Sequence, residues 1–368
     1  LMGDLPVTTF VGGAAFLAVM VLGETPQRSN FCTMGALSDM VFMGDSRRFR
    51  SWMLAIAVAI LATQSMQAAG LITIGKSIYL AKNLGWAGAV LGGLMFGFGM
   101  TLGGGCGNKT LVRIGGGNLK SVIFALVLGI FAYMTLRGLI GLARVNFIEP
   151  LTMDLGKSGL ASQGLDEMLA VVTGLSHATA RWAVALVVAG GLLVFCFKDG
   201  AFRSSKRDMI AGVLIGLLVA AGWYITGVIG NDEFEPVALT SFSFVAPTGE
   251  SIQYLMTFTG STINFGIASV GGVIFGSFVM SLATRSFHLE AFSDAPDMLR
   301  HLTGAALMGV GGVLALGCTV GQGLTGVSTL ALGSWIALVS ILAGGYLGLK
   351  YLEDGSLFGA VRAVFARG

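Results

Sequence analysis

Long apolar stretches with almost no charge constrain the fold of this chain more than any other feature. We identify nine candidate membrane spans, at about residues 8–23, 51–74, 86–103, 119–142, 182–197, 209–229, 265–282, 301–316 and 334–349. Charged residues make up 11% of the chain, against roughly 25% in soluble domains. A soluble protein of this length could not solvate its surface with so few charges. The sequence therefore predicts an all-α membrane protein with about nine transmembrane helices.

Composition also limits the kinds of partner. The chain has 57 glycines, about twice the usual share, and small residues let membrane helices approach closely or break. A net charge of +3 indicates no nucleic-acid partner. The four cysteines form no C-x-x-C pair, so we predict no metal site and no cofactor, and we expect free thiols.

One motif occurs twice in the chain. Residues 97–107 read GFGMTLGGGCG and residues 309–319 read GVGGVLALGCT. Each is a glycine-rich apolar run that ends in Gly-Cys and is followed by small and polar residues. We expect a re-entrant half-helix after Cys106 and another after Cys318, because both segments are too short and too polar to span again. Cysteine is also a common small core residue, and that remains the alternative reading for either position alone.

The residues around these cysteines are candidate substrate contacts. We assign this role to Cys32, Cys106 and Cys318, and to the polar residues Asn108, Lys109, Thr319 and Gln322. Near Cys32, Ser29 or Asn30 is expected to cap a short helix. Cys196 has no repeat partner and is expected to be structural. The cluster of Arg47, Arg48 and Arg50 is read mainly as a membrane anchor.

The distribution of basic residues predicts an orientation. With nine spans, sixteen lysines and arginines, including Arg362 and Arg367, fall on the side of Cys32, and five fall on the other side. The positive-inside rule then places the N-terminus outside and the C-terminus in the cytoplasm. In this arrangement the two Gly-Cys elements have opposite orientations. An Asn-Phe pair at residues 30–31 and again at 264–265 is a second possible correspondence.

These matches predict an inverted-topology repeat within a single membrane domain covering residues 1–368. The first repeat covers about residues 8–145, a connecting region about 146–208, and the second repeat about 209–350. Residues 149–176 are expected to contain an interfacial helix. Residues 231–260, with alternating serine and phenylalanine, are expected to pack over a mouth of the protein.

At residues 29–36, 97–106 and 309–321 the chain resembles the YeeE/YedE family of sulfur-compound transporters, and the resemblance extends over about residues 8–350. It implies a helical protein of the bacterial inner membrane that takes up thiosulfate or a related sulfur anion, with functional cysteines at Cys32, Cys106 and Cys318. It also implies a small cytosolic sulfur-carrier protein as partner. Family members often have Gly-Cys-Thr at both repeats, whereas this chain has Gly107 after Cys106, which leaves the substrate open.

The physical expectation is passage of the anion along protonated cysteine thiols, from Cys318 to Cys106 and then Cys32. A thiolate would repel an anion, whereas a neutral thiol can hold a soft sulfur atom weakly. Two alternatives remain. The chain is either a membrane-embedded thiol redox or sulfurtransferase enzyme, or a transporter of another sulfur or selenium compound. We prefer a transporter to an enzyme because the sequence shows no paired base or redox motif beside the cysteines.

Overall fold

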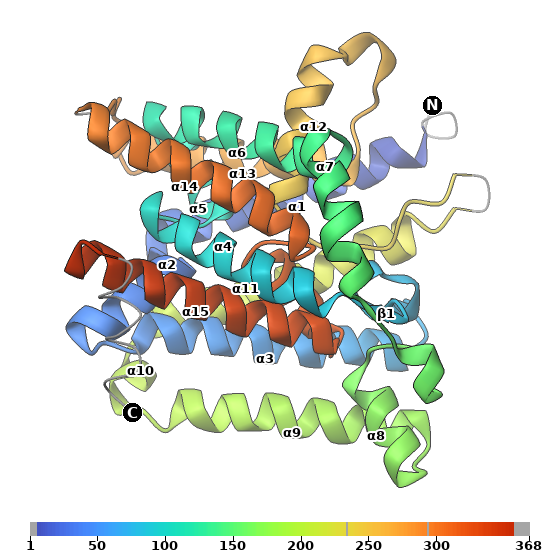
Figure 1. The fold of residues 1–368 in the computed structure, drawn as a ribbon. Coiled ribbons are helices and arrows are strands. Elements are labelled where there is room, and N and C mark those ends of the chain that lie inside the picture. Colours follow the sequence, from blue (N-terminus) through green and yellow to red (C-terminus); the bar gives the residue numbers. More distant parts are fainter. Residues whose placement is uncertain (1–5, 233–234, 293, 357–368) are drawn as a thin grey trace.

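The computed structural model describes residues 6–232, 235–292 and 294–356 as a bundle of long helices running side by side (Figure 1). The long helices are α1 (Val7–Ser29), α3 (Arg47–Ala68), α4 (Trp86–Leu102), α6 (Leu119–Arg137), α9 (His177–Phe197), α11 (Lys206–Tyr224), α13 (Phe265–Ala283), α14 (Ala295–Leu314) and α15 (Leu332–Asp354). Residues Arg362 and Arg367, which entered the charge count, lie outside the described residues.

Shorter elements connect these helices. The short helices are α2 (Thr33–Ser38), α5 (Gly107–Gly115), α7 (Leu139–Ala143), α8 (Leu165–Thr173), α10 (Gly200–Ser204) and α12 (Val245–Met256). Wider π-helical turns are η1 (Asp39–Met43), η4 (Arg144–Ile148), η7 (Ile225–Ile229) and η9 (Gly321–Gly326), and tighter 3₁₀ turns are η2 (Ile74–Lys76), η3 (Ile78–Leu80), η5 (Glu149–Leu151), η6 (Leu155–Ser158) and η8 (Phe258–Gly260). Strands β1 (Asn83–Leu84) and β2 (Met153–Asp154) pair antiparallel.

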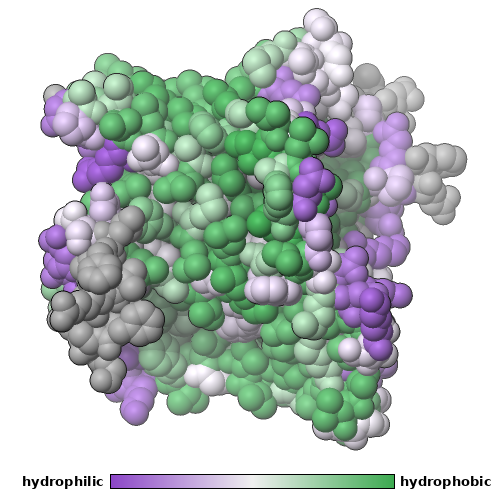
Figure 2. All heavy atoms as spheres, viewed as in Figure 1, coloured by the Kyte–Doolittle hydropathy of each residue, from purple (hydrophilic) through white to green (hydrophobic). Residues whose placement is uncertain are grey.

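The prediction of a multi-pass helical membrane protein is confirmed. Within the described ranges, eight helices are long and apolar enough to cross a membrane, and each coincides with a predicted span. Figure 2 shows the apolar side chains as a broad band between two polar ends. The ninth predicted span falls in α14, which is 20 residues long but carries Asp297, Arg300 and His301 in its early turns. Because of these polar residues, α14 is long enough but not apolar enough to be counted among the eight helices.

Glycine packs the long helices against one another. A Cβ on Gly97 of α4 would clash with the backbone oxygen of Ile341 in α15, and one on Gly276 of α13 with that of Met20 in α1. The same kind of contact joins Gly216 of α11 to Ala55 of α3. Close backbone approach gives dispersion contacts that lipid cannot replace, and only glycine permits it. The helix pairs α4–α15, α1–α13, α3–α11 and α6–α14 are each parallel, while α4 and α14 run antiparallel.

The two polar ends differ in charge. One end, here called the basic end, holds the starts of α3, α6 and α14 with Arg47, Arg50, Lys120 and Arg300, and lies at the left of Figure 1. Lys120 Nζ lies 3.3 Å from Glu290 and 3.2 Å from Asp297. The other end, called the opposite end, holds the start of α1, strand β1 and helix α12.

The two long connections contain more structure than the sequence suggested. Residues 149–176 include β2 and helix α8. Residues 231–260 do not simply cover a mouth: Phe242 and Phe244 are both 0% exposed, and Phe242 stacks on Phe265 at 5.2 Å. Thr325 donates a hydrogen bond to the carbonyl oxygen of Phe242 (2.8 Å). This connection therefore enters the core of the bundle.

Candidate functional site

Cys106 lies where one membrane helix breaks. Helix α4 ends at Leu102, and Gly104 takes a left-handed conformation (φ +66°), which glycine adopts without strain. Cys106 then occupies the N-cap of α5 and is 2% exposed. The half-helix predicted after Cys106 is therefore present as α5.

Cys32 lies at a second break. Asn30 is the left-handed C-cap of α1 (φ 53°), and Cys32 is the N-cap of α2, 4% exposed. The prediction that Ser29 or Asn30 caps the short helix is wrong. Asparagine tolerates the left-handed conformation that ends α1, so the following helix begins two residues later. The thiols of Cys32 and Cys106 lie within hydrogen-bonding reach of each other.

Cys318 lies at a third break, after α14. Leu316 is left-handed (φ 59°), and Gly317 also has a positive φ of 159°. Cys318 is 0% exposed, and the N–H of Gly321 donates to its Sγ (3.4 Å). A short π-helical turn, η9, follows in place of the predicted half-helix. Cys318 and Cys106 are close enough to interact electrostatically.

The fold thus brings together three free thiols from segments far apart in the sequence. Cys196 is separate from them. Its Sγ donates to the carbonyl oxygen of Arg50 (3.2 Å), and it packs with Leu54 and Phe202 in a cluster beside α9. Cys196 is therefore a small buried core residue, which agrees with the expectation that it is structural.

Four buried polar atoms without partners belong to residues within four positions of Cys32, Cys106 or Cys318 in the sequence. Thr33 Oγ1, Asn108 Oδ1, Thr319 Oγ1 and Gln322 Oε1 are buried and have no hydrogen-bond partner among the described residues. Leaving such an atom unpaired costs about 1–3 kcal/mol. Buried polar atoms in native proteins are nearly always paired, so these four atoms are sites where a ligand or water can complete the bonds. Asn108, Thr319 and Gln322 were predicted site residues, and Thr33 was not.

Cations lie on the basic-end side of Cys32 and Cys106. Lys109 Nζ donates to Asn30 Oδ1 (3.4 Å), and Arg48 Nη2 donates to the carbonyl oxygen of Asn30 (3.0 Å). Arg48 also pairs with Asp39 at 2.6 Å. Arg48 was read from the sequence mainly as an anchor, with a substrate-collecting role as the lesser alternative, and its contact with Asn30 depends on tertiary packing.

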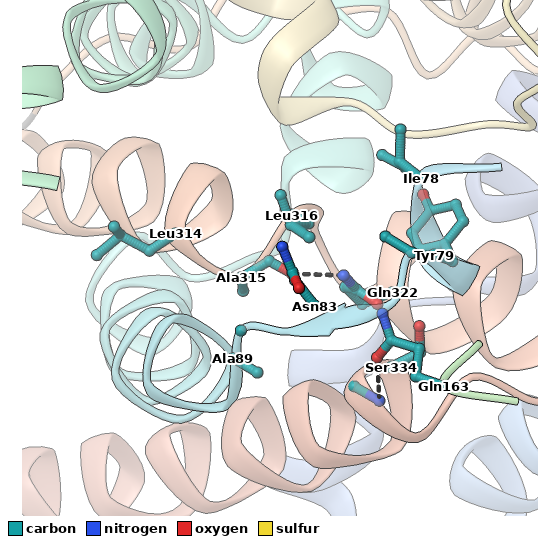
Figure 3. A pocket seen from close by; sticks show the side chains of 13 residues that line it. Ile78, Tyr79, Asn83, Ala89, Gln163, Leu314, Ala315, Leu316, Gln322 and Ser334 are labelled. Atoms are coloured by element: carbon teal, nitrogen blue, oxygen red, sulfur yellow. Dashed lines mark hydrogen bonds between the residues drawn. The ribbon is translucent and has the colours of Figure 1, made fainter. Parts of the chain in front are cut away.

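Two cavities lie on the opposite-end side of Cys318. The larger, about 410 Å³, is lined by Tyr79, Ser243, Glu250 and Leu316 among others. The smaller, about 70 Å³, is lined by Asn83, Gln163 and Gln322 (Figure 3). Tyr79 and Leu316 line both cavities. Sequence reasoning missed Tyr79 and Ser243, and the only signal for Ser243 was its place in the serine–phenylalanine alternation.

Comparison with known proteins identifies the family of this chain. A family profile described as sulphur transport matches residues 28–347, a range that includes all three breaks. The chain belongs to the sulphur transport family. Two curated relatives in the comparison are both named thiosulfate transporter TsuA. The protein of Escherichia coli is 28% identical over 320 residues, covering 83% of this chain and 84% of the relative. The protein of Spirochaeta thermophila is 28% identical over 312 residues, covering 83% and 88%.

Membership in the sulphur transport family confirms the resemblance seen in the motifs. It identifies a transport protein of the membrane and not an enzyme. In a member of this family, helix breaks lined by thiols and unpaired polar atoms are suited to hold and release a sulfur-containing solute.

Proposed function

We propose that the protein imports thiosulfate along a path past Cys318, Cys106 and Cys32. The observation that carries this proposal is the meeting of three buried free thiols at helix breaks, beside buried polar atoms that lack partners. The relatives named thiosulfate transporters support the choice of substrate.

The chemistry of the site suits this anion. Thiosulfate carries two negative charges, three hard oxygens and one soft terminal sulfur. Neutral thiols are weak donors that can contact the soft sulfur without holding it tightly, and a permeation path needs sites weak enough to release their occupant. Asn108, Thr319 and Gln322 supply polar groups for the oxygens, and Lys109 neutralises charge as the anion leaves Cys106 and Cys32.

The two halves of the chain are, in this proposal, inverted repeats of about residues 8–145 and 209–350. The helix pairing supports this. If α1, α3, α4 and α6 correspond to α11, α13, α14 and α15, then the pair α1–α13 becomes α11–α3, and α4–α15 becomes α14–α6. The helices of all four pairs are in contact, as an inverted repeat requires. The correspondence of the two Asn-Phe pairs does not fit, because Asn30 ends α1 while Asn264 begins α13.

The direction of transport follows from the charges. We place the basic end in the cytoplasm of a bacterial inner membrane, with the N-terminus outside and the C-terminus inside. The anion would then move from the neutral side chains around Cys318 toward Lys109 and Arg48. The sulfur-carrier protein implied by the resemblance would receive it at the basic end.

Uptake of radiolabelled thiosulfate by vesicles that contain the purified protein tests the path. Each of the variants Cys32→Ala, Cys106→Ala and Cys318→Ala should lower the initial rate at least about tenfold, the effect of losing roughly 1.4 kcal/mol of stabilisation on the path. Cys196→Ala is the matched control, because this buried cysteine packs in a separate cluster with Leu54 and Phe202, and it should keep the wild-type rate. Wild-type rates in all three pathway variants would contradict the path.

The remaining question of substrate is answered by competition in the same vesicles. Unlabelled thiosulfate should compete fully, and sulfite or a selenium oxyanion only weakly. A stronger effect of either competitor would reassign the substrate. Intact mass of the protein after exposure to thiosulfate should be unchanged, since the path involves contact without a covalent step.

A further inference from the structure

The side of Cys318 that faces the opposite end has its own polar groups. Ser243 lies between the buried Phe242 and Phe244 and is itself half-buried at the wall of the 410 Å³ cavity. A Cβ on Gly321 would lie 2.5 Å from Ser243 Oγ, and the N–H of the same glycine donates to Cys318 Sγ. The Ser243 hydroxyl and the Cys318 thiol therefore both lie next to one residue, Gly321.

Tyr79 supplies a second hydroxyl. It lines the same cavity beside Leu316, and it also lines the smaller adjoining cavity, where Figure 3 shows its ring at one side. Its ring packs edge-on against Trp223 at 6.3 Å. Burial raises the pKa of the Tyr79 phenol, and the neighbouring Cys318 adds to the effect. The phenol is therefore protonated at neutral pH and is a hydrogen-bond donor.

Neither hydroxyl is used by the protein itself. The described residues offer no hydrogen-bond partner to Ser243 Oγ or to the Tyr79 phenol. By contrast, the nearby hydroxyls of Ser241 and Thr325 donate to backbone carbonyl oxygens at 2.7 and 2.8 Å. Two donors are thus left free at the wall of one cavity, next to a thiol.

The packing around Ser243 repeats that around Cys32. Phe31 stacks on Trp52 near the start of α3 (5.0 Å, 19°) and directly precedes Cys32. Phe242 stacks on Phe265 at the start of α13 (5.2 Å, 14°) and directly precedes Ser243. Helices α3 and α13 are partners in the proposed repeat. Ser243 therefore has, beside Cys318, the place that Cys32 has beside Cys106, with a hydroxyl instead of a thiol.

We propose that the Tyr79 and Ser243 hydroxyls form a binding subsite for the oxygen end of a sulfur oxyanion, oriented with its terminal sulfur toward Cys318. This inference rests on the proposed function and adds the contacts that receive the substrate. Hydroxyl donors suit hard oxygens, whereas the thiol suits the soft sulfur. Glu250 lines the same cavity and accepts a hydrogen bond from Asn264 (3.0 Å). The subsite therefore acts through positioned donors and not through net positive charge.

Kinetics of thiosulfate uptake by vesicles with the full chain test the subsite. Ser243→Ala and Tyr79→Phe should each raise KM about tenfold, the loss of one hydrogen bond to a charged group, with a smaller effect on the maximal rate. The matched controls are Ser204→Ala, whose hydroxyl donates to Ala201 O at the basic end, and Tyr133→Phe, which lines other cavities. Both controls should keep the wild-type KM.

A conservative variant separates binding from folding. Ser243→Cys restores a donor of the kind found at Cys32 and should give a KM between those of the wild type and Ser243→Ala. Its thiol should react with a membrane-impermeant maleimide, and thiosulfate should protect it more than it protects a Lys82→Cys control, whose residue is exposed at the same end.

The outcomes are distinct. If the wild type takes up no thiosulfate, the proposed function fails. If the wild type transports but Ser243→Ala and Tyr79→Phe share its KM, the subsite is overturned while the proposed function stands. Equal protection of Ser243→Cys and Lys82→Cys also overturns the subsite.

Discussion

At the scale of single residues, Leu316 combines backbone strain with an exposed position. It is left-handed at φ 59°, yet its side chain is 50% exposed and lines both cavities. Two residues before the other Gly-Cys cysteine, the equivalent position is Gly104 at φ +66°. A non-glycine residue costs roughly 1–2 kcal/mol in this conformation. Strain that persists at such a position points to a role for the side chain, and we propose that Leu316 covers Cys318.

Replacing Leu316 by glycine should separate these two effects. The variant Leu316→Gly should unfold at a temperature no lower than the wild type, because relief of backbone strain offsets the lost side chain. It should also make Cys318, which is 0% exposed, react faster with a small impermeant thiol reagent. Unchanged Cys318 labelling in a stable variant would mean that Leu316 does not cover the thiol.

At the scale of elements, glycine decides how closely the helices approach. Gly97 of α4 meets the backbone of Ile341 and Gly345 in α15, whereas Gly190 of α9 has nothing within 4 Å. The same residue type thus serves close packing in the centre of the bundle and has no packing role on the peripheral helix α9.

The pair Gly97→Ala and Gly190→Ala tests this difference. Gly97→Ala should lower the free energy of unfolding by about 1–3 kcal/mol, because the added methyl overpacks the α4–α15 contact. Gly190→Ala should be neutral or stabilising, since it has room and alanine favours helix. Denaturant unfolding in detergent measures both. An equal decrease in the free energy of unfolding of the two variants would show that close helix packing at Gly97 does not stabilise the protein.

At the scale of the whole molecule, the proposed direction of transport rests on the charges at the two ends. Basic residues at the starts of α3, α6 and α14 gather at one end, and the cavities beside Cys318 open at the other. In the proposed orientation the anion moves toward positive charge, and we place that charge in the cytoplasm by the positive-inside rule.

Labelling of intact cells tests the orientation. Lys82→Cys lies in an exposed loop of the opposite end, and Ser204→Cys is exposed at the basic end. An impermeant maleimide should label Lys82→Cys in intact cells and Ser204→Cys only after the membrane is permeabilised. The reverse pattern would invert the proposed direction, and the buried native cysteines keep the background low.

Much of this architecture could be predicted from the sequence, because membrane spans are local. A run of apolar residues long enough to cross a bilayer has few alternatives to a helix, and eight such helices lie where the runs predicted them. The break before Cys106 was also predictable, since three consecutive glycines follow α4 and the residues after Cys106 are polar. These conclusions depend only on the residues of each segment.

Only the tertiary structure decided which of these segments meet. Three contacts join segments that the sequence keeps apart. Phe31 stacks on Trp52. Phe242 and Phe244 are buried in the core, and Ser243 lies next to Gly321. The sequence placed the serine–phenylalanine segment at the surface because its alternation carries no information about its partners. Hydropathy reports how a segment interacts with lipid, whereas the site depends on contacts between segments, and those are set by how the whole bundle packs.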